Sequence, residues 1–306
     1  MRASFLDPGD RRVGNLVLSP ADGPRDTPDI PVTNTSPPSS TGSSDTRQVG
    51  AIIMAAGKGT RMKSDLPKVM HEACGRPMVR WVVDAAKSAG VSGITLVIGH
   101  GAEIVRAAFE RDAEIRFAMQ MPQLGTGHAV DQARPHFMPM RADDDVFVLC
   151  GDGPLIRPAT LKALLETHRA TSASATLATS VIEEPTGYGR IERDGRGDFR
   201  RIVEQKDATP AQLAIREVNP SYYCFRVGDL FAALAKVDNK NASGEYYITD
   251  VFELLLKEGK RVAVVDAVPA EDVLSVNTPE QLAEVSRILL GRTQAVSPDL
   301  ARGRYA

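Results

Sequence analysis

Short apolar runs alternate with amphipathic stretches of helical period from Val49 onward, and this alternation limits the folds open to the chain. Short, nearly continuous apolar runs are typical of strands buried on both faces of a sheet. Strands separated by helices form βαβ units, whose crossovers place the strands side by side and parallel. The pattern predicts strands at Val49–Ala55, Ile94–Ile98, Ile115–Ala118 and Val146–Leu149, and helices at Met78–Ala89, Ala102–Glu110 and Gly127–Ala133.

The pattern after residue 160 is less regular, which predicts a smaller mixed or antiparallel portion folded over the first half. Strands are expected at Ala173–Val181, Gly189–Arg193, Arg201–Glu204, Arg216–Phe225 and Val262–Val265. Helices are expected at Leu161–His168, Asp229–Leu234, Ile248–Leu256 and Pro279–Leu290. Together the two halves predict an α/β, Rossmann-like fold with a mostly parallel twisted sheet.

Residues 1–46 differ in composition from the rest, with seven prolines, seven serines and almost no apolar periodicity. Such a segment has too little apolar surface to offset the entropy lost on ordering it. We therefore expect a disordered arm at residues 1–46, one domain at 47–293 and a flexible tail at 294–306. A linker, a tag-like extension or a misassigned start explains the arm better than a functional tail does.

Charge, cysteine content and the lengths of the apolar runs exclude several classes of partner and of site. The 37 basic and 39 acidic residues give a net charge of -2, which argues against nucleic acid or an anionic membrane as a partner. Cys74, Cys150 and Cys224 are too few and too scattered for a disulfide framework or a Cys-based zinc site. No apolar run approaches the ~20 residues of a membrane span, and the N-terminus lacks a signal peptide's apolar core. These features predict a soluble, cytoplasmic protein.

A glycine-rich loop, Ala55–Arg61, follows the first predicted strand directly. Glycines after a strand let backbone N–H groups approach an anion closely. The loop lacks the glycine spacing of a P-loop, and Met62 stands where a dinucleotide-binding loop has its third glycine. Arg61 and Lys68 add two cations beside the loop, which suits a polyphosphate. The alternative is a tight turn with solvated charges.

Asp152 follows the predicted strand Val146–Leu149 almost at once. Open α/β sheets bind ligands at the carboxyl ends of their strands. A carboxylate at that edge is a candidate ligand for Mg²⁺, which prefers oxygen donors.

Several motifs resemble one family of enzymes. Gly57–Met62 and Leu66–Lys68 resemble the signature of the sugar nucleotidyltransferases. Four later blocks narrow the resemblance to the uridylyltransferase half of the bacterial bifunctional N-acetylglucosamine-1-phosphate uridylyltransferase/glucosamine-1-phosphate acetyltransferase, over about residues 49–291. These blocks are Gln123–Ala129, Pro185–Ile191, Ile202–Ala208 and Gly244–Asp250.

The resemblance implies a nucleotidyltransferase fold whose mixed portion binds sugar. The implied reaction is Mg²⁺-dependent and converts UTP and N-acetylglucosamine 1-phosphate to UDP-N-acetylglucosamine, a cell wall precursor, and pyrophosphate. The catalytic residues would be Arg61, at the leaving phosphates, and Lys68, near the reacting centre. Asp152 and Asn277 would hold the metal. The nucleotide would contact Met54, Ala55, Ala56, Gly57 and Gly151, with uracil at Gln120, Gly125 and Thr126, and the sugar would contact Gly189, Glu204, Asn219, Tyr247 and Thr249.

We expect His128 to be a structural residue in the first turn of a helix under the loop rather than a catalytic residue. By itself Asn277 would also be taken for a residue that initiates a helix, but the resemblance reverses that preference.

This chain departs from the family in three respects. It contains no hexapeptide repeat of the acetyltransferase half, so acetyl transfer is not expected and the oligomeric state stays open. Pro220-Ser221 stands where the family usually has Thr-Gly, and Gly153 stands where it usually has an aliphatic residue. The choice of sugar is therefore less firmly predicted than the reaction. The alternatives are another sugar 1-phosphate, such as glucose 1-phosphate, and a catalytically silent homologue that senses nucleotide sugars.

Overall fold

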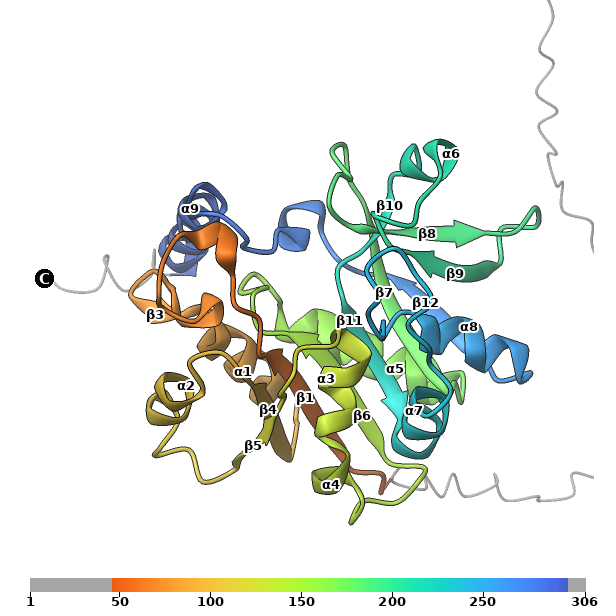
Figure 1. Cartoon of the computed structure of the whole chain (residues 1–306), viewed down its shortest axis with the longest axis horizontal. Coiled ribbons are helices and arrows are strands. Elements are labelled where there is room, and N and C mark those ends of the chain that lie inside the picture. Colours follow the sequence, from red (N-terminus) through yellow and green to blue (C-terminus); the bar gives the residue numbers. More distant parts are fainter. Residues whose placement is uncertain (1–45, 297–306) are drawn as a thin grey trace, which may run out of the picture. The chain divides into compact units, whose positions relative to one another are not determined.

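The structure, a computed structural model, describes residues 46–296 (Figure 1). The predicted arm and tail, residues 1–46 and 294–306, lie outside this range apart from their innermost residues. Described strands are β1 Val49–Ala55, β2 Glu72–Ala73, β3 Arg76–Pro77, β4 Gly93–Ile98, β5 Ile115–Met119, β6 Asp145–Cys150, β7 Ala175–Val181, β8 Gly189–Arg193, β9 Phe199–Val203, β10 Glu217–Asn219, β11 Tyr222–Arg226 and β12 Val262–Asp266. Described α-helices are α1 Met78–Ser88, α2 Ala102–Ala108, α3 Thr126–Gln132, α4 Arg134–Phe137, α5 Pro158–Ala170, α6 Pro210–Leu213, α7 Val227–Leu234, α8 Asp250–Lys257 and α9 Pro279–Val296.

The first half forms a parallel sheet in the order β5-β4-β1-β6. Alternate residues of β1 belong to different cores: Ala51 and Ile53 pack with α1 and α5, whereas Ile52 packs with α3 and α8. Helices therefore cover both faces of the sheet, as Figure 1 shows. This confirms the α/β, Rossmann-like fold with a mostly parallel sheet in this half.

The second half adds antiparallel strands to the same sheet. β11 lies between β6 and β7 and is antiparallel to both, while β12 pairs with the other edge of β7 in parallel. β10 pairs with the end of β7 and with β8, and β8 in turn pairs with β9, all in antiparallel orientation. The predicted mixed portion is thus confirmed as an extension of the parallel sheet.

The prediction of one continuous strand at Arg216–Phe225 is wrong. It is divided into β10 and β11 at Pro220-Ser221. Proline has no N–H for a strand ladder, and Ser221 has a φ of 64°, in the left-handed region. The chain therefore leaves the ladder at these two residues and rejoins it at Tyr222.

The sequence pattern did not reveal the shortest elements: the β2–β3 hairpin, α4, α6 and three 3₁₀ helices. The last helix was placed correctly at its start but extends to Val296, beyond the predicted Leu290. Among the helices of residues 46–296, none combines the length and apolar character needed to cross a membrane.

Candidate active site

The strand order reverses between β1 and β6, and both strands end beside one another. β4 and β5 lie on one side of β1 and β6 lies on the other. The Gly151 N–H donates to the Met54 carbonyl at 2.9 Å, which joins the two strand ends. Ligands bind at such switch points because the connections diverge there and leave a crevice. The predicted residues Ala55 and Gly151 are buried at this junction.

The glycine loop turns back onto the side chain of Lys68. Gly59 has a φ of 64°, and a Cβ at this position would lie 2.5 Å from the Lys68 Cβ. Only glycine satisfies both the left-handed backbone and the close approach. The loop therefore holds the Lys68 side chain at the carboxyl end of β1, as a phosphate-binding role requires.

Four residues predicted to act together meet at this point. The Lys68 ammonium forms an ion pair with Asp152 Oδ2 and donates to Asn277 Oδ1 at 2.8 Å. Arg61 Nη2 donates to the same Asn277 oxygen at 2.8 Å. Two cations and two oxygen ligands from distant parts of the chain therefore share one small volume.

Asn277 is available for this role because another residue begins α9. Gln281 N–H donates to Thr278 Oγ1 at 3.3 Å, and Gln281 Oε1 accepts from the Thr278 N–H at 3.2 Å. This reciprocal pair is a capping box, with Thr278 as its N-cap. Gln281 also accepts from the Asn277 N–H at 2.7 Å, which fixes that residue's backbone. Sequence reasoning missed Gln281, although the Thr-x-x-Gln spacing is its signal.

The oxygens of Asp152 and Asn277 fit a divalent cation. Both converge on a single nitrogen, that of Lys68, so one positive centre can contact both. A carboxylate and an amide oxygen are hard donors of the kind Mg²⁺ prefers, and Mg²⁺ keeps its other positions for phosphate oxygens and water. This pair is the part of the site that could hold the predicted metal.

Two cavities meet at Asp152. A cavity of about 300 Å³ contains most of the residues predicted to contact the nucleotide: Met54, Ala56, Gly57, Lys68, Gln120, Gly125 and Thr126. A second, of about 390 Å³, contains residues predicted for the sugar and the metal, Gly189, Glu204, Asn219 and Asn277. Arg61, predicted for the leaving phosphates, lines this second cavity too. Cys150 and Asp152 line both. A group in either cavity can therefore reach the same carboxylate.

In the first cavity, Gln120 is held in one orientation. Its Nε2 donates to the Gly125 carbonyl at 3.0 Å and contacts His128 Nδ1 at 3.1 Å. The bond to Gly125 uses one amide hydrogen and fixes the amide, which leaves Oε1 as the acceptor available to a ligand. His128 lies in the first turn of α3, as predicted, and it also orients Gln120.

The loop before α3 is clamped by the segment before α8. A Cβ at Gly125 would lie 2.6 Å from the Tyr246 carbonyl. The Tyr246 N–H donates to the Leu124 carbonyl at 2.8 Å, and the Ile248 N–H donates to Thr126 Oγ1 at 3.0 Å. The Thr126 hydroxyl thus has a structural contact in addition to its predicted role.

The second cavity is built on β8, β9 and β10. A Cβ at Gly189 would lie 2.9 Å from Ile202 Cγ2, so glycine permits the close pairing of β8 with β9. Asn219 is buried and donates from Nδ2 to the Tyr223 hydroxyl at 2.7 Å. Tyr188, which sequence reasoning did not assign, also lines this cavity within the predicted block Pro185–Ile191.

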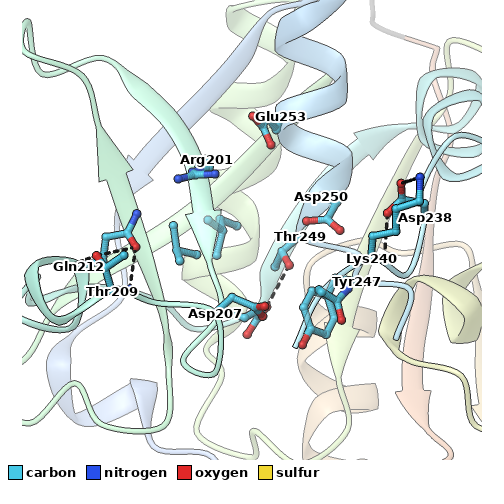
Figure 2. Close-up of a pocket in the computed structure, with 14 residues that line it drawn as sticks. Arg201, Asp207, Thr209, Gln212, Asp238, Lys240, Tyr247, Thr249, Asp250 and Glu253 are labelled. Carbon is cyan, nitrogen blue, oxygen red and sulfur yellow. Dashed lines mark hydrogen bonds and ion pairs between the residues drawn. The ribbon is translucent and has the colours of Figure 1, made fainter. Parts of the chain in front are cut away.

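Tyr247 and Thr249 line a third cavity (Figure 2). Glu204 lines both the second and the third cavity. Thr249 Oγ1 donates to Glu204 Oε1 at 2.9 Å, and burial raises the pKa of Glu204. The predicted sugar residues are therefore linked through Glu204 but do not share one cavity.

Asp250→Asn is expected to stabilise the protein in a pH-dependent manner. Burial and the nearby charge of Glu204 raise the pKa of Asp250 to about 6, against about 3.9 for aspartate in an unfolded chain. The folded chain therefore binds this proton more tightly, and stability is lost as the pH rises between these values. We expect Asp250→Asn to raise the free energy of unfolding at pH 7.5 by about 1 kcal/mol, since solvent screens a half-buried group. The gain should shrink towards pH 4.

Urea unfolding of both proteins across this pH range measures the effect. Asp198→Asn, in the exposed turn between β8 and β9, is the matched control and should show no such trend. A gain that is equal at pH 4 and pH 7.5 would contradict the assignment.

The fold and the site together define a class of protein. A Rossmann-like sheet with a glycine loop at its switch point and two cavities meeting at one carboxylate is the architecture of a nucleotidyltransferase. Residues 51–245 match the family model described as "MobA-like NTP transferase domain". The chain belongs to this family.

The curated relatives agree with this membership. The chain is 47% identical to the "Bifunctional protein GlmU" of Pelotomaculum thermopropionicum over 244 residues, which cover 80% of this chain and 52% of that protein. It is 47% identical to the protein of that name from Geobacter metallireducens over 239 residues, 78% and 50% of the two chains. The chain therefore spans about half the length of the curated relatives it matches.

A solved structure shows the same fold. It is described as a glucose-1-phosphate thymidylyltransferase from Bacillus anthracis in complex with sucrose, and it superposes with a TM-score of 0.65. The match covers 78% of this chain and 94% of that one, at 17% sequence identity. At this identity the likeness supports the fold alone.

Proposed function

We propose that the chain transfers UMP from UTP to N-acetylglucosamine 1-phosphate, giving UDP-N-acetylglucosamine and pyrophosphate. The observation that carries the proposal is the meeting of two cavities at Asp152, with Lys68, Arg61 and Asn277 at their junction. This arrangement would bring a nucleoside triphosphate and a sugar phosphate together at one reacting centre. The identity to the two GlmU proteins supports this choice of substrates.

The chemistry explains why the site holds cations rather than a catalytic base. The attacking oxygen belongs to the sugar phosphate and is already an anion at neutral pH. It attacks the α-phosphorus, and the bond from that phosphorus to the bridging oxygen of pyrophosphate breaks. No proton has to be removed, so catalysis depends on positioning and on stabilising negative charge.

The two cations have distinct parts in this mechanism. Lys68 is partly buried and held by the glycine loop, so its ammonium can act as a fixed point charge near the α-phosphate. Arg61 is exposed at the edge of the second cavity, and its guanidinium can contact two phosphate oxygens at once. In the proposed mechanism, Arg61 stabilises the charge on the leaving pyrophosphate.

Asp152 and Asn277 would hold Mg²⁺ in the proposed reaction. The metal would supply positive charge to the phosphate oxygens and help to orient them. Lys68 shares its contacts with these two oxygens. We therefore propose that Lys68 exchanges part of this contact for phosphate oxygens when substrates bind.

The orientation of Gln120 supports uracil as the base. Its free Oε1 can accept a hydrogen bond from the N3–H of uracil, whereas the N3 of cytosine carries no hydrogen.

A cytoplasmic setting is also part of the proposal. It is supported by the three cysteines, all within residues 46–296 and all free.

Release of pyrophosphate tests the proposal. Purified protein with Mg²⁺ is expected to release pyrophosphate with UTP and N-acetylglucosamine 1-phosphate. Turnover should fall at least about 100-fold when EDTA replaces Mg²⁺ and should recover when Mg²⁺ is added back.

A panel of UTP, dTTP, CTP and ATP with N-acetylglucosamine 1-phosphate and glucose 1-phosphate distinguishes the alternatives. A higher kcat/KM for glucose 1-phosphate would reject the named sugar but not the reaction. No turnover with any pair, despite binding of UDP-N-acetylglucosamine, would favour a catalytically silent homologue.

A further inference from the structure

The break between β10 and β11 is a bulge that faces the second cavity. Val218 pairs with Ser180 of β7, and Tyr223 pairs with Leu177 of the same strand. The chain therefore advances five residues on one side of the ladder against three on the other. Bulges beside functional sites redirect side chains out of the regular strand pattern. Here the bulged residues Asn219, Pro220 and Ser221 all line the cavity.

Ser221 occupies an unfavourable backbone conformation within this bulge. Its φ of 64° is one that residues other than glycine rarely adopt. The conformation is held in place because the Ser221 N–H donates to Asn219 Oδ1 at 3.0 Å. Strain that the surrounding structure maintains is a guide to functional positions.

The Ser221 side chain reaches both parts of the site. Its hydroxyl interacts with the Cys150 thiol at the end of β6 and with the buried Tyr223 hydroxyl. Cys150 lines both the nucleotide and the sugar phosphate cavities. The Ser221 hydroxymethyl group therefore packs where the wall of the sugar cavity meets the end of β6, two residues before Asp152.

We propose that Ser221 is a specificity-determining residue, whose side chain limits the ring substituents that the second cavity accepts on a hexose 1-phosphate. This inference rests on the proposed function. Glycine at this position would fit the backbone better but would leave the cavity wider. The side chain therefore shapes the wall at the expense of backbone strain.

Ser221→Gly tests the proposal, with Ser172→Gly as the matched control. Ser172 follows α5, is exposed, and has a φ of 52°, so glycine relieves the same kind of strain away from the cavities. We expect each variant to shift the melting temperature by only a few degrees. Only Ser221→Gly should change discrimination between N-acetylglucosamine 1-phosphate and glucose 1-phosphate. The ratio of their kcat/KM values should shift about tenfold in favour of N-acetylglucosamine 1-phosphate, because the wider cavity admits the larger acetamido group more readily.

Ser221→Ala separates the two contributions of the side chain. It keeps the Cβ, so its ratio should lie between those of wild type and Ser221→Gly. A ratio within twofold of wild type in Ser221→Gly would overturn the inference, as would an equal change in Ser172→Gly. If the wild-type chain used neither sugar phosphate, the proposed function and this inference would both fall. An active wild type with an unaltered Ser221→Gly ratio would overturn the inference alone.

Discussion

Asp152→Ala and Arg61→Ala are each expected to lower kcat by at least about 100-fold while changing the melting temperature little. Asp152 is the carboxylate shared by both cavities, and its removal deletes a metal ligand from the proposed site. Arg61 is exposed and donates to Asn277, so alanine removes charge rather than core packing. Lys68 keeps its contact with Asn277 in the Asp152 variant, which limits the structural damage.

Pyrophosphate release at saturating Mg²⁺, together with thermal unfolding, separates the two effects. Asp198→Ala and Arg196→Ala are matched controls, because both residues lie in the exposed turn between β8 and β9. The controls should retain wild-type turnover. Near wild-type turnover in Asp152→Ala or Arg61→Ala would show that the role proposed for that residue is wrong.

UTP is expected to be used at least about 100-fold better than CTP or ATP, measured as kcat/KM. The contacts of the Gln120 amide with Gly125 and His128 fix its orientation, so its Oε1 loses its partner when the base has no hydrogen on the ring nitrogen that faces it, as uracil has on N3. A buried group left unpaired in this way discriminates more strongly than a difference in apolar contact does. Gln120→Ala should therefore lower kcat/KM for UTP and bring the UTP and CTP values closer together.

Gln132→Ala is the control for this prediction. Gln132 contacts the opposite nitrogen of the same histidine, with 3.2 Å between its Nε2 and His128 Nε2. The Gln132→Ala variant tests whether disturbing His128 alone alters selectivity between UTP and CTP. Equal use of ATP by the wild type would overturn the choice of nucleotide, and equal losses of selectivity in both variants would assign the effect to His128.

Much of the fold could be predicted from local sequence because buried parallel strands have a distinctive pattern. β1 has the predicted bounds, and β4, β5 and β6 differ by one residue at one or both ends. Each is a short apolar run flanked by turn or helix residues, so its identity depends on its own side chains. The short elements α4 and α6 have only four residues each, too few to show a period.

The division of Arg216–Phe225 shows where local pattern is insufficient. The residues of β10 and β11 have strand character throughout, and Pro220 was the available sign of a break. What places the break is the pairing of both strands with β7, which the sequence pattern does not show.

The sequence by itself determined the sheet, the glycine loop and the residue types that the phosphate chemistry requires. Only the tertiary structure decided which of them meet: Asn277 reaches Lys68 across 209 residues, and Thr278 rather than Asn277 caps α9. It also placed Tyr247 and Thr249 in a cavity separate from that of Gly189 and Asn219. The physical reason is that local propensity depends on neighbours in the chain, whereas the site depends on packing between segments that the sequence separates. The docking of α9 on the β2–β3 hairpin, through Val285, Leu289 and Ala73, brings Asn277 into place.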